Sequence, residues 1–149
     1  MSFFIGEYEY AIDNKGRLNI PAKFRKAMSP NANDTFVIKE GPERCLDVYP
    51  LDIYQEKIVS KLNGFSEMKK SHRKLTSLIG GSSAYSELDK QGRIMIPPKF
   101  IGHADLENKV IIIGAFNRIE IWNPQIRKKY IEESKLALEE FDEDVLLES

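Results

Sequence analysis

The chain has 149 residues and nearly balanced charge, with 22 Lys and Arg against 23 Asp and Glu and a formal net charge of −1 at pH 7. This balance excludes a polybasic nucleic-acid binder that relies on net charge alone. The single cysteine, Cys45, excludes an intrachain disulfide. Because neither a signal peptide nor an apolar run of membrane-spanning length is visible, we expect a protein of the reducing cytoplasm with no membrane partner.

The charge is nevertheless distributed unevenly along the chain. Residues 1–124 carry 18 Lys and Arg against 15 Asp and Glu, whereas residues 125–149 carry 4 against 8. The body is therefore mildly basic and the tail acidic. Any affinity for DNA must come from the local placement of cations or from several subunits acting together.

The chain begins with an apolar segment, Phe3-Phe4-Ile5, which we expect to pack against the core or a neighbouring subunit. Tyr8, Tyr10 and Ile12 then alternate with polar or small residues. This alternation predicts a half-buried strand.

A compact motif follows at residues 13–24, Asp-Asn-Lys-Gly-Arg-Leu-Asn-Ile-Pro-Ala-Lys-Phe. Asp13 and Gly16 predict a tight turn, because Asp can bond its own backbone and Gly supplies a positive φ. The alternating apolar residues after the turn predict a second strand, and Pro21 suits the first position of a short helix over residues 23–27.

The same motif returns at residues 89–100, Asp-Lys-Gln-Gly-Arg-Ile-Met-Ile-Pro-Pro-Lys-Phe, at a constant offset of 76. Such a period indicates two copies of one small module rather than a solenoid array. A half of this size buries a marginal core, so we expect the two copies to share one core across a pseudo-twofold axis.

Two further strands are predicted at residues 36–38 and 45–49, with a turn between them. Asp52 and Gln55 then form a capping-box pattern at the start of a helix, and Gly64 suits its C-terminal cap.

A second helix is predicted over residues 67–78 and contains the basic run 69–74. Such a run forms either a nucleic-acid patch or, more commonly, a solvated helix face. The Gly- and Ser-rich residues 80–83 predict a flexible joint between the copies.

In copy two, residues 110–113 are apolar throughout and predict a central strand. Asn123 and Pro124 predict the start of a last helix. Its apolar side comprises Ile126, Tyr130, Leu138 and Phe141, and its acidic end spans residues 139–144. This end is expected to be a frayed surface tail, or alternatively a competitor of DNA, in which case deleting residues 139–149 should tighten DNA binding.

The residue directly after each motif glycine, Arg17 or Arg93, is the main functional clue. A long cation at the tip of a rigid hairpin, with Lys15 or Lys90 nearby, can enter a DNA groove or grip phosphates. Alternatively, each Arg forms an ion pair with the Asp of its own motif and only sets the shape of the turn. The two interpretations are compatible, since a carboxylate can also aim a guanidinium.

These paired motifs resemble the MraZ family of bacterial transcriptional regulators. The resemblance extends to residues 3–8, 45–50 and 114–122, and departs from the family at Asp105, where glycine is common. It implies an α+β fold of two AbrB-like swapped-hairpin modules and a homo-oligomer in the form of a ring. It also implies sequence-specific binding to repeated promoter boxes in double-stranded DNA, repression of the protein's own division and cell-wall gene cluster, and a nucleoid-associated location.

We expect a first module at residues 1–52, a helical connector at 53–81, a second module at 82–124, and a C-terminal helix and acidic tail at 125–149. Arg17 is the first candidate for a contact to a base edge or groove, and the turns are oriented by Asp13, Gly16, Asp89 and Gly92. The full set of expected DNA-binding residues is Lys15, Arg17, Lys23, Arg25, Lys90, Arg93 and Lys99. Because Gln91 stands where copy one has Lys15, copy two is expected either to bind more weakly or to serve the oligomer.

Catalysis is not expected. His72 and His103 have no Cys, His or carboxylate cluster at metal-ligand spacing. The repeated Asp13 and Asp89 suggest a comparison with aspartic proteases, but bulky cationic or amide residues follow each of them. We therefore expect no catalytic residue, no metal and no cofactor, and the main alternative to a DNA regulator is a protein-interaction scaffold with structural Asp–Arg turns.

Overall fold

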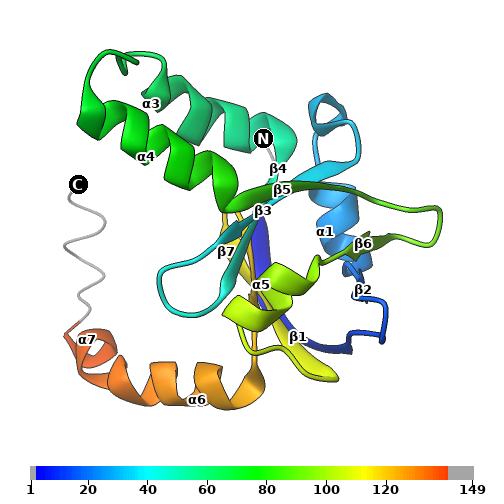
Figure 1. Ribbon diagram of the computed structural model, residues 1–149. Coiled ribbons are helices and arrows are strands. Elements are labelled where there is room, and N and C mark those ends of the chain that lie inside the picture. Colours follow the sequence, from blue (N-terminus) through cyan, green and yellow to red (C-terminus); the bar gives the residue numbers. More distant parts are fainter. Residues whose placement is uncertain (1–2, 141–149) are drawn as a thin grey trace.

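The computed structural model describes residues 3–140 and is built on a six-stranded antiparallel sheet and a separate two-stranded ribbon (Figure 1). The strands are β1 (Phe4–Ala11), β2 (Arg17–Asn19), β3 (Thr35–Glu40), β4 (Leu46–Pro50), β5 (Ser83–Glu87), β6 (Arg93–Met95), β7 (Lys109–Phe116) and β8 (Ile119–Trp122). The sheet has the order β1-β7-β8-β4-β3-β5, and the ribbon consists of β2 and β6.

The helices are short and lie around these strands. They are α1 (Ala22–Ala27), α2 (Leu51–Tyr54), α3 (Ser60–Leu62), α4 (Lys70–Gly81), α5 (Pro98–His103), α6 (Pro124–Glu133) and α7 (Lys135–Glu139). A 3-10 turn, η1 (Pro30–Ala32), precedes β3, and a π-helical turn, η2 (Gln55–Val59), joins α2 to α3. Within residues 3–140, no helix is long and apolar enough to cross a membrane.

Strand pairing interleaves the two copies of the motif. β1 of copy one pairs with β7 of copy two, β5 of copy two pairs with β3 of copy one, and β2 pairs with β6. The α+β fold of two swapped-hairpin modules is therefore confirmed.

One core serves both copies. Leu18 and Phe24 of copy one and their equivalents Ile94 and Phe100 of copy two are each at most 3% exposed and belong to a single cluster of buried side chains. β7 lies inside the sheet between β1 and β8, as expected, and alternates between fully buried Val110 or Ile112 and half-buried residues on the other face.

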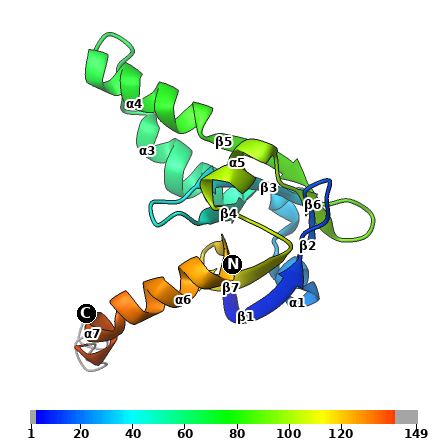
Figure 2. The same cartoon turned by 60° about the horizontal axis from the view of Figure 1, so that its bottom comes forward.

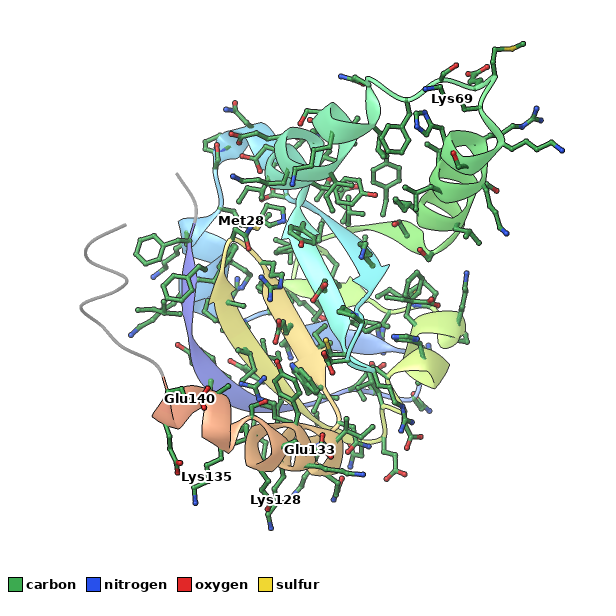
Figure 3. All side chains as sticks on the ribbon, turned by 90° about the vertical axis from the view of Figure 1, so that its left-hand side faces the viewer. Met28, Lys69, Lys128, Glu133, Lys135 and Glu140 are labelled. Atoms are coloured by element: carbon green, nitrogen blue, oxygen red, sulfur yellow. The ribbon has the colours of Figure 1, made fainter. Side chains whose placement is uncertain are left out.

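The longer helices lie on the side of the molecule away from the ribbon. In Figures 1 and 2, α3 and α4 form one arm and α6 with α7 another, whereas β2, β6 and their turns project from the opposite side. Figure 3 places Lys69 at the tip of the first arm and Lys128 on α6 of the second.

A buried charge cluster attaches α6 to the sheet. Glu120 accepts hydrogen bonds from Trp122 Nε1 at 3.0 Å and Arg118 Nη2 at 2.7 Å, and lies 3.7 Å from Arg127 Nη1. Arg118 Nε also lies 3.5 Å from Asp47, whose pKa is raised chiefly by burial. The ionised form of Asp47 is therefore disfavoured relative to an exposed carboxylate.

Several local predictions differ from the structure at helix ends. Asp52 is not the N-cap, because β4 runs directly into α2 and Pro50 takes that position. Residues 80–83 are not a flexible joint: α4 continues to Gly81, and the hydroxyls of Ser82 and Ser83 both donate to Ile79 O at its end. The same carbonyl also accepts from the backbone N–H of Ser82 at 3.2 Å, so the end of α4 is fixed by several hydrogen bonds.

The prolines of the motif precede their helices rather than begin them. Pro21 and Pro97 occupy the N-cap positions, and Pro98 takes the first helical position in α5. Pro97 is extended because the residue before a proline is disfavoured in the helical region.

The predicted N-cap of α6 is confirmed. Asn123 caps α6 by accepting from the N–H groups of Gln125 and Ile126. Asp105, the position at which the chain departs from the resemblance, has a φ of 50°, in the left-handed region that favours glycine. The predicted cap at Gly64 is wrong: Asn63 is the C-cap of α3, and Gly64 does not have the positive φ typical of a glycine that ends a helix.

The apolar start of the chain divides between the core and the surface. Phe4 is fully buried, as expected, whereas Phe3 and Ile5 are each 58% exposed. Phe141 and the side chain of Leu138, which we predicted on the apolar side of the last helix, lie outside the described part of the structure.

Candidate nucleic-acid interface

The turn of copy one is closed by its aspartate. Asp13 Oδ1 accepts from the backbone N–H of Lys15 at 2.9 Å and of Arg17 at 2.8 Å, and Oδ2 accepts from Arg17 Nε at 2.7 Å. Gly16 has a φ of 82°, as the turn prediction requires.

The turn of copy two repeats this geometry. Asp89 Oδ1 accepts from Gln91 N and Arg93 N, both at 2.9 Å, and Oδ2 accepts from Arg93 Nε at 2.8 Å. Gly92 has a φ of 77°. The backbone N–H of Arg17 is the largest cause that lowers the pKa of Asp13, and that of Arg93 has the same effect on Asp89.

Each carboxylate therefore stays ionised and fixes one edge of its arginine. Among residues 3–140, neither Nη atom of Arg17 or Arg93 has a hydrogen-bond or ion-pair partner, and the two side chains are 33% and 24% exposed. The ion pair sets the shape of the turn and also leaves the two Nη groups of each arginine available to donate hydrogen bonds to a ligand.

The ribbon brings the two arginines onto one surface. β2 and β6 pair antiparallel, with Leu18 opposite Ile94 and both buried in the core. The alternate pairs, Arg17 opposite Met95 and Asn19 opposite Arg93, are directed to the other face, where Asn19 and Met95 are exposed.

Our sequence analysis missed Asn19 and Met95. The period-two alternation of the motif strands carried the signal, since residues two positions apart share a face. Only the pairing of β2 with β6 shows that these two side chains are neighbours of Arg17 and Arg93.

The two turns also hold each other. Ile20 N donates to Gly92 O at 3.0 Å, and the equivalent Ile96 N donates to Gly16 O at 2.8 Å. The backbone of each turn is thus fixed by the strand end of the other copy, and the two turns and the ribbon form one connected unit.

The remaining predicted residues divide into two groups. Lys15 and Lys90 are exposed in the turns of copy one and copy two, and Lys23 is exposed on α1. Arg25 Nε donates to Ile20 O at 3.0 Å, and Lys99 Nζ donates to Gly81 O at 2.7 Å at the end of α4.

The basic run at residues 69–74 does not join this surface. It begins at Lys69 at the tip of the helical arm and continues along α4, on the side away from the ribbon (Figures 1 and 3). The described part of the acidic end, in α7, also lies away from the ribbon.

Two interleaved hairpin modules that share one core and carry a duplicated Asp–Gly–Arg turn define a double swapped-hairpin protein. A family model described as "MraZ protein, putative antitoxin-like" matches the chain twice, at residues 3–78 and 80–148. The chain is also 36% identical over 143 residues to a protein of Pediococcus pentosaceus named "Transcriptional regulator MraZ", with 96% of both chains covered. The chain therefore belongs to the MraZ family, a family of transcriptional regulators, as the resemblance of its motifs indicated.

Proposed function

We propose that the protein is a sequence-specific DNA-binding regulator that reads the major groove with the β2–β6 ribbon. The observation that supports this proposal most directly is the pair of guanidinium groups of Arg17 and Arg93. Each is held at Nε by a carboxylate, and neither Nη atom has a partner within the described residues 3–140. It has the donor geometry that binds guanine O6 and N7 in a bidentate manner.

The shape of the ribbon supports the same function. The major groove admits a two-stranded β-ribbon, and a face with arginines, an amide and an apolar side chain offers the contacts that distinguish base pairs there. Lys15, Lys23 and Lys90 lie around this face and suit phosphate contacts, which position a protein without reading sequence.

Self-association into a ring is part of the proposal. The two edge strands of the sheet, β1 and β5, have different exposed apolar surroundings. Phe3, Ile5 and Phe116 lie at one edge, and Leu78 and Tyr85 at the other.

Unlike surfaces at opposite edges can cover one another only in a head-to-tail contact, which closes into a ring when the rotation permits. A ring presents many ribbons side by side and suits repeated promoter boxes. As the resemblance to the MraZ family implies, we further propose that the protein represses its own division and cell-wall gene cluster.

The test measures binding to a duplex from the region upstream of the protein's own gene. Fluorescence anisotropy gives the affinity at each of several salt concentrations. Loss of one bidentate contact in Arg17→Ala should weaken binding by about 1–3 kcal/mol per ribbon engaged. Lys128→Ala removes a cation from α6 on the other side of the molecule and should leave binding unchanged. Circular dichroism and sedimentation verify the fold and the oligomer of both variants.

The scaffold interpretation makes the opposite prediction. If the Asp–Arg turns are purely structural, Arg17→Ala should disturb the fold or the oligomer, and the wild-type protein should show no preference for the upstream duplex over a shuffled one. A hydrolase would require an activity that disappears in Asp13→Asn and Asp89→Asn.

A further inference from the structure

We propose that Arg25, a residue of copy one, completes the DNA-binding surface of copy two. The inference rests on the proposed function and concerns how the two ends of the ribbon are built. It assigns Arg25 to the turn of Asp89 and Gly92 rather than to the turn of its own motif.

The position of Arg25 carries this assignment. Its Nε donates to Ile20 O at 3.0 Å, at the end of the motif strand of copy one. Its guanidinium lies directly against Gly92, since a Cβ on that glycine would be 2.7 Å from both Cζ and Nη1 of Arg25. Arg93, the reading arginine of copy two, is the next residue in the chain.

The equivalent place in copy one is filled by an apolar side chain. The offset of 76 relates Arg25 to Ile101, whose Cδ1 would be 3.5 Å from a Cβ on Gly16. An isoleucine is therefore sufficient to pack beneath this kind of turn. Packing beneath the turn therefore does not explain why a cation stands at position 25.

Arg25 is anchored in the same way as the two reading arginines. Arg17, Arg93 and Arg25 each use Nε for a hydrogen bond within the chain. Arg25 is exposed, and within residues 3–140 it has no carboxylate partner and its Nη atoms have no hydrogen-bond partner. Arg93 is already paired with Asp89, so Arg25 adds a guanidinium without a carboxylate partner to this turn, and a phosphate is an anion that such a group binds well.

The two ends of the ribbon then carry comparable cations by different means. Copy one has Arg17 and Lys15 from its own turn. Copy two has Arg93 and Lys90 in its turn, with Gln91 at the position of Lys15, and Arg25 adds a further guanidinium from the other copy. Copy two is accordingly a binding element in its own right.

The test compares Arg25→Ile, which installs the side chain found in copy one, with Lys26→Ile, which removes an exposed cation from the same helix. Both are titrated with the upstream duplex over a salt series. For Arg25→Ile we expect binding to weaken about tenfold and the slope of log K against log salt to fall by about 0.9 for each ribbon engaged, the value for one phosphate contact on B-DNA. For Lys26→Ile we expect neither change.

The reciprocal variant Ile101→Arg tests the same idea by gain rather than loss. It places a guanidinium beneath the Gly16 turn and should steepen the salt slope by about 0.9. Double variants locate the site. Combined with Arg93→Met, Arg25→Ile should lose less DNA affinity than the product of the two single fold-losses. Combined with Arg17→Met, the two fold-losses should multiply.

The possible results are distinguishable. If the wild-type protein shows no salt-dependent binding, the proposed function itself fails. If the wild-type protein binds but Arg25→Ile behaves as Lys26→Ile does, or if Arg25 couples with Arg17 instead of Arg93, only the assignment of Arg25 to copy two is overturned. Should Arg25→Ile not fold, the Ile101→Arg slope decides.

Discussion

The two motif glycines should respond differently to alanine, although their sequence contexts are almost the same. Both have positive φ values, 82° at Gly16 and 77° at Gly92. An L-residue in this region costs about 1–2 kcal/mol, so both substitutions share that loss. The difference arises from what the new methyl group would meet.

At Gly16 the added Cβ would lie 2.5 Å from the backbone oxygen of Ile96, whereas at Gly92 its three nearest atoms belong to the Arg25 guanidinium. A flexible side chain can move away, but a peptide group in the ribbon cannot. Moving it would also strain the hydrogen bond from Ile96 N to Gly16 O, and an unsatisfied buried group costs about 1–3 kcal/mol. We therefore expect Gly16→Ala to lose about 2–5 kcal/mol of unfolding free energy and Gly92→Ala about 1–2 kcal/mol.

The assay is urea unfolding followed by tryptophan fluorescence, at one fixed protein concentration because association contributes to stability. Gly64→Ala is the matched control, since nothing lies within 4 Å of its Cβ position. Equal losses at Gly16 and Gly92, or a larger loss at Gly92, would refute the steric reasoning. Gly92→Ala should in addition weaken DNA binding, because it displaces Arg25.

Four other expectations follow from the contacts described above. Carbon-13 NMR should give Asp13 and Asp89 carboxyl pKa values below the ordinary aspartate value of 3.8, so the turns gain stability above the unfolded-state pKa and lose it as pH falls through the folded-state value; values at or above 3.8 would contradict the observed bonds. Asp47→Asn should raise the melting temperature at pH 7, because burial raises the pKa of this carboxyl and its ionisation there opposes folding; a lower melting temperature would show that its contact with Arg118 outweighs desolvation. Asn123→Ala should lower the unfolding free energy by about 1 kcal/mol through loss of the α6 cap, with Gln125→Ala as a neighbouring control. The Cys45 thiol, whose pKa burial raises to about 12, should resist iodoacetamide at pH 8 until the protein is unfolded, and rapid native-state labelling would argue against its burial.

Local chemistry explains which parts of this fold are predictable from the sequence. The Asp–Gly turns and the Asn123 cap depend on bonds between residues a few positions apart, so their patterns are visible in the chain itself. The shared core was predictable because each copy alone is too small to bury one.

Pairing between the copies was not predictable from the same signals. The neighbours of Arg17 on the ribbon are Met95 and, diagonally, Arg93, which lie far away in sequence. The contact of Arg25 with Gly92 likewise depends on tertiary packing. The full set of residues in the candidate site could therefore be identified only from the structure, whereas Arg17 and Arg93 could be identified from the sequence.

Because both hairpins belong to one polypeptide, the two ends of the ribbon can carry different side chains, whereas in a homodimer of single modules they must be identical. In such a dimer each end carries the same side chains, and the preferred base sequence is palindromic. Here evolution can alter one end alone, as the Lys15 to Gln91 and Ile101 to Arg25 differences illustrate. On the proposed function, the operator of this protein should be a set of direct, directional boxes with no inverted symmetry inside each box.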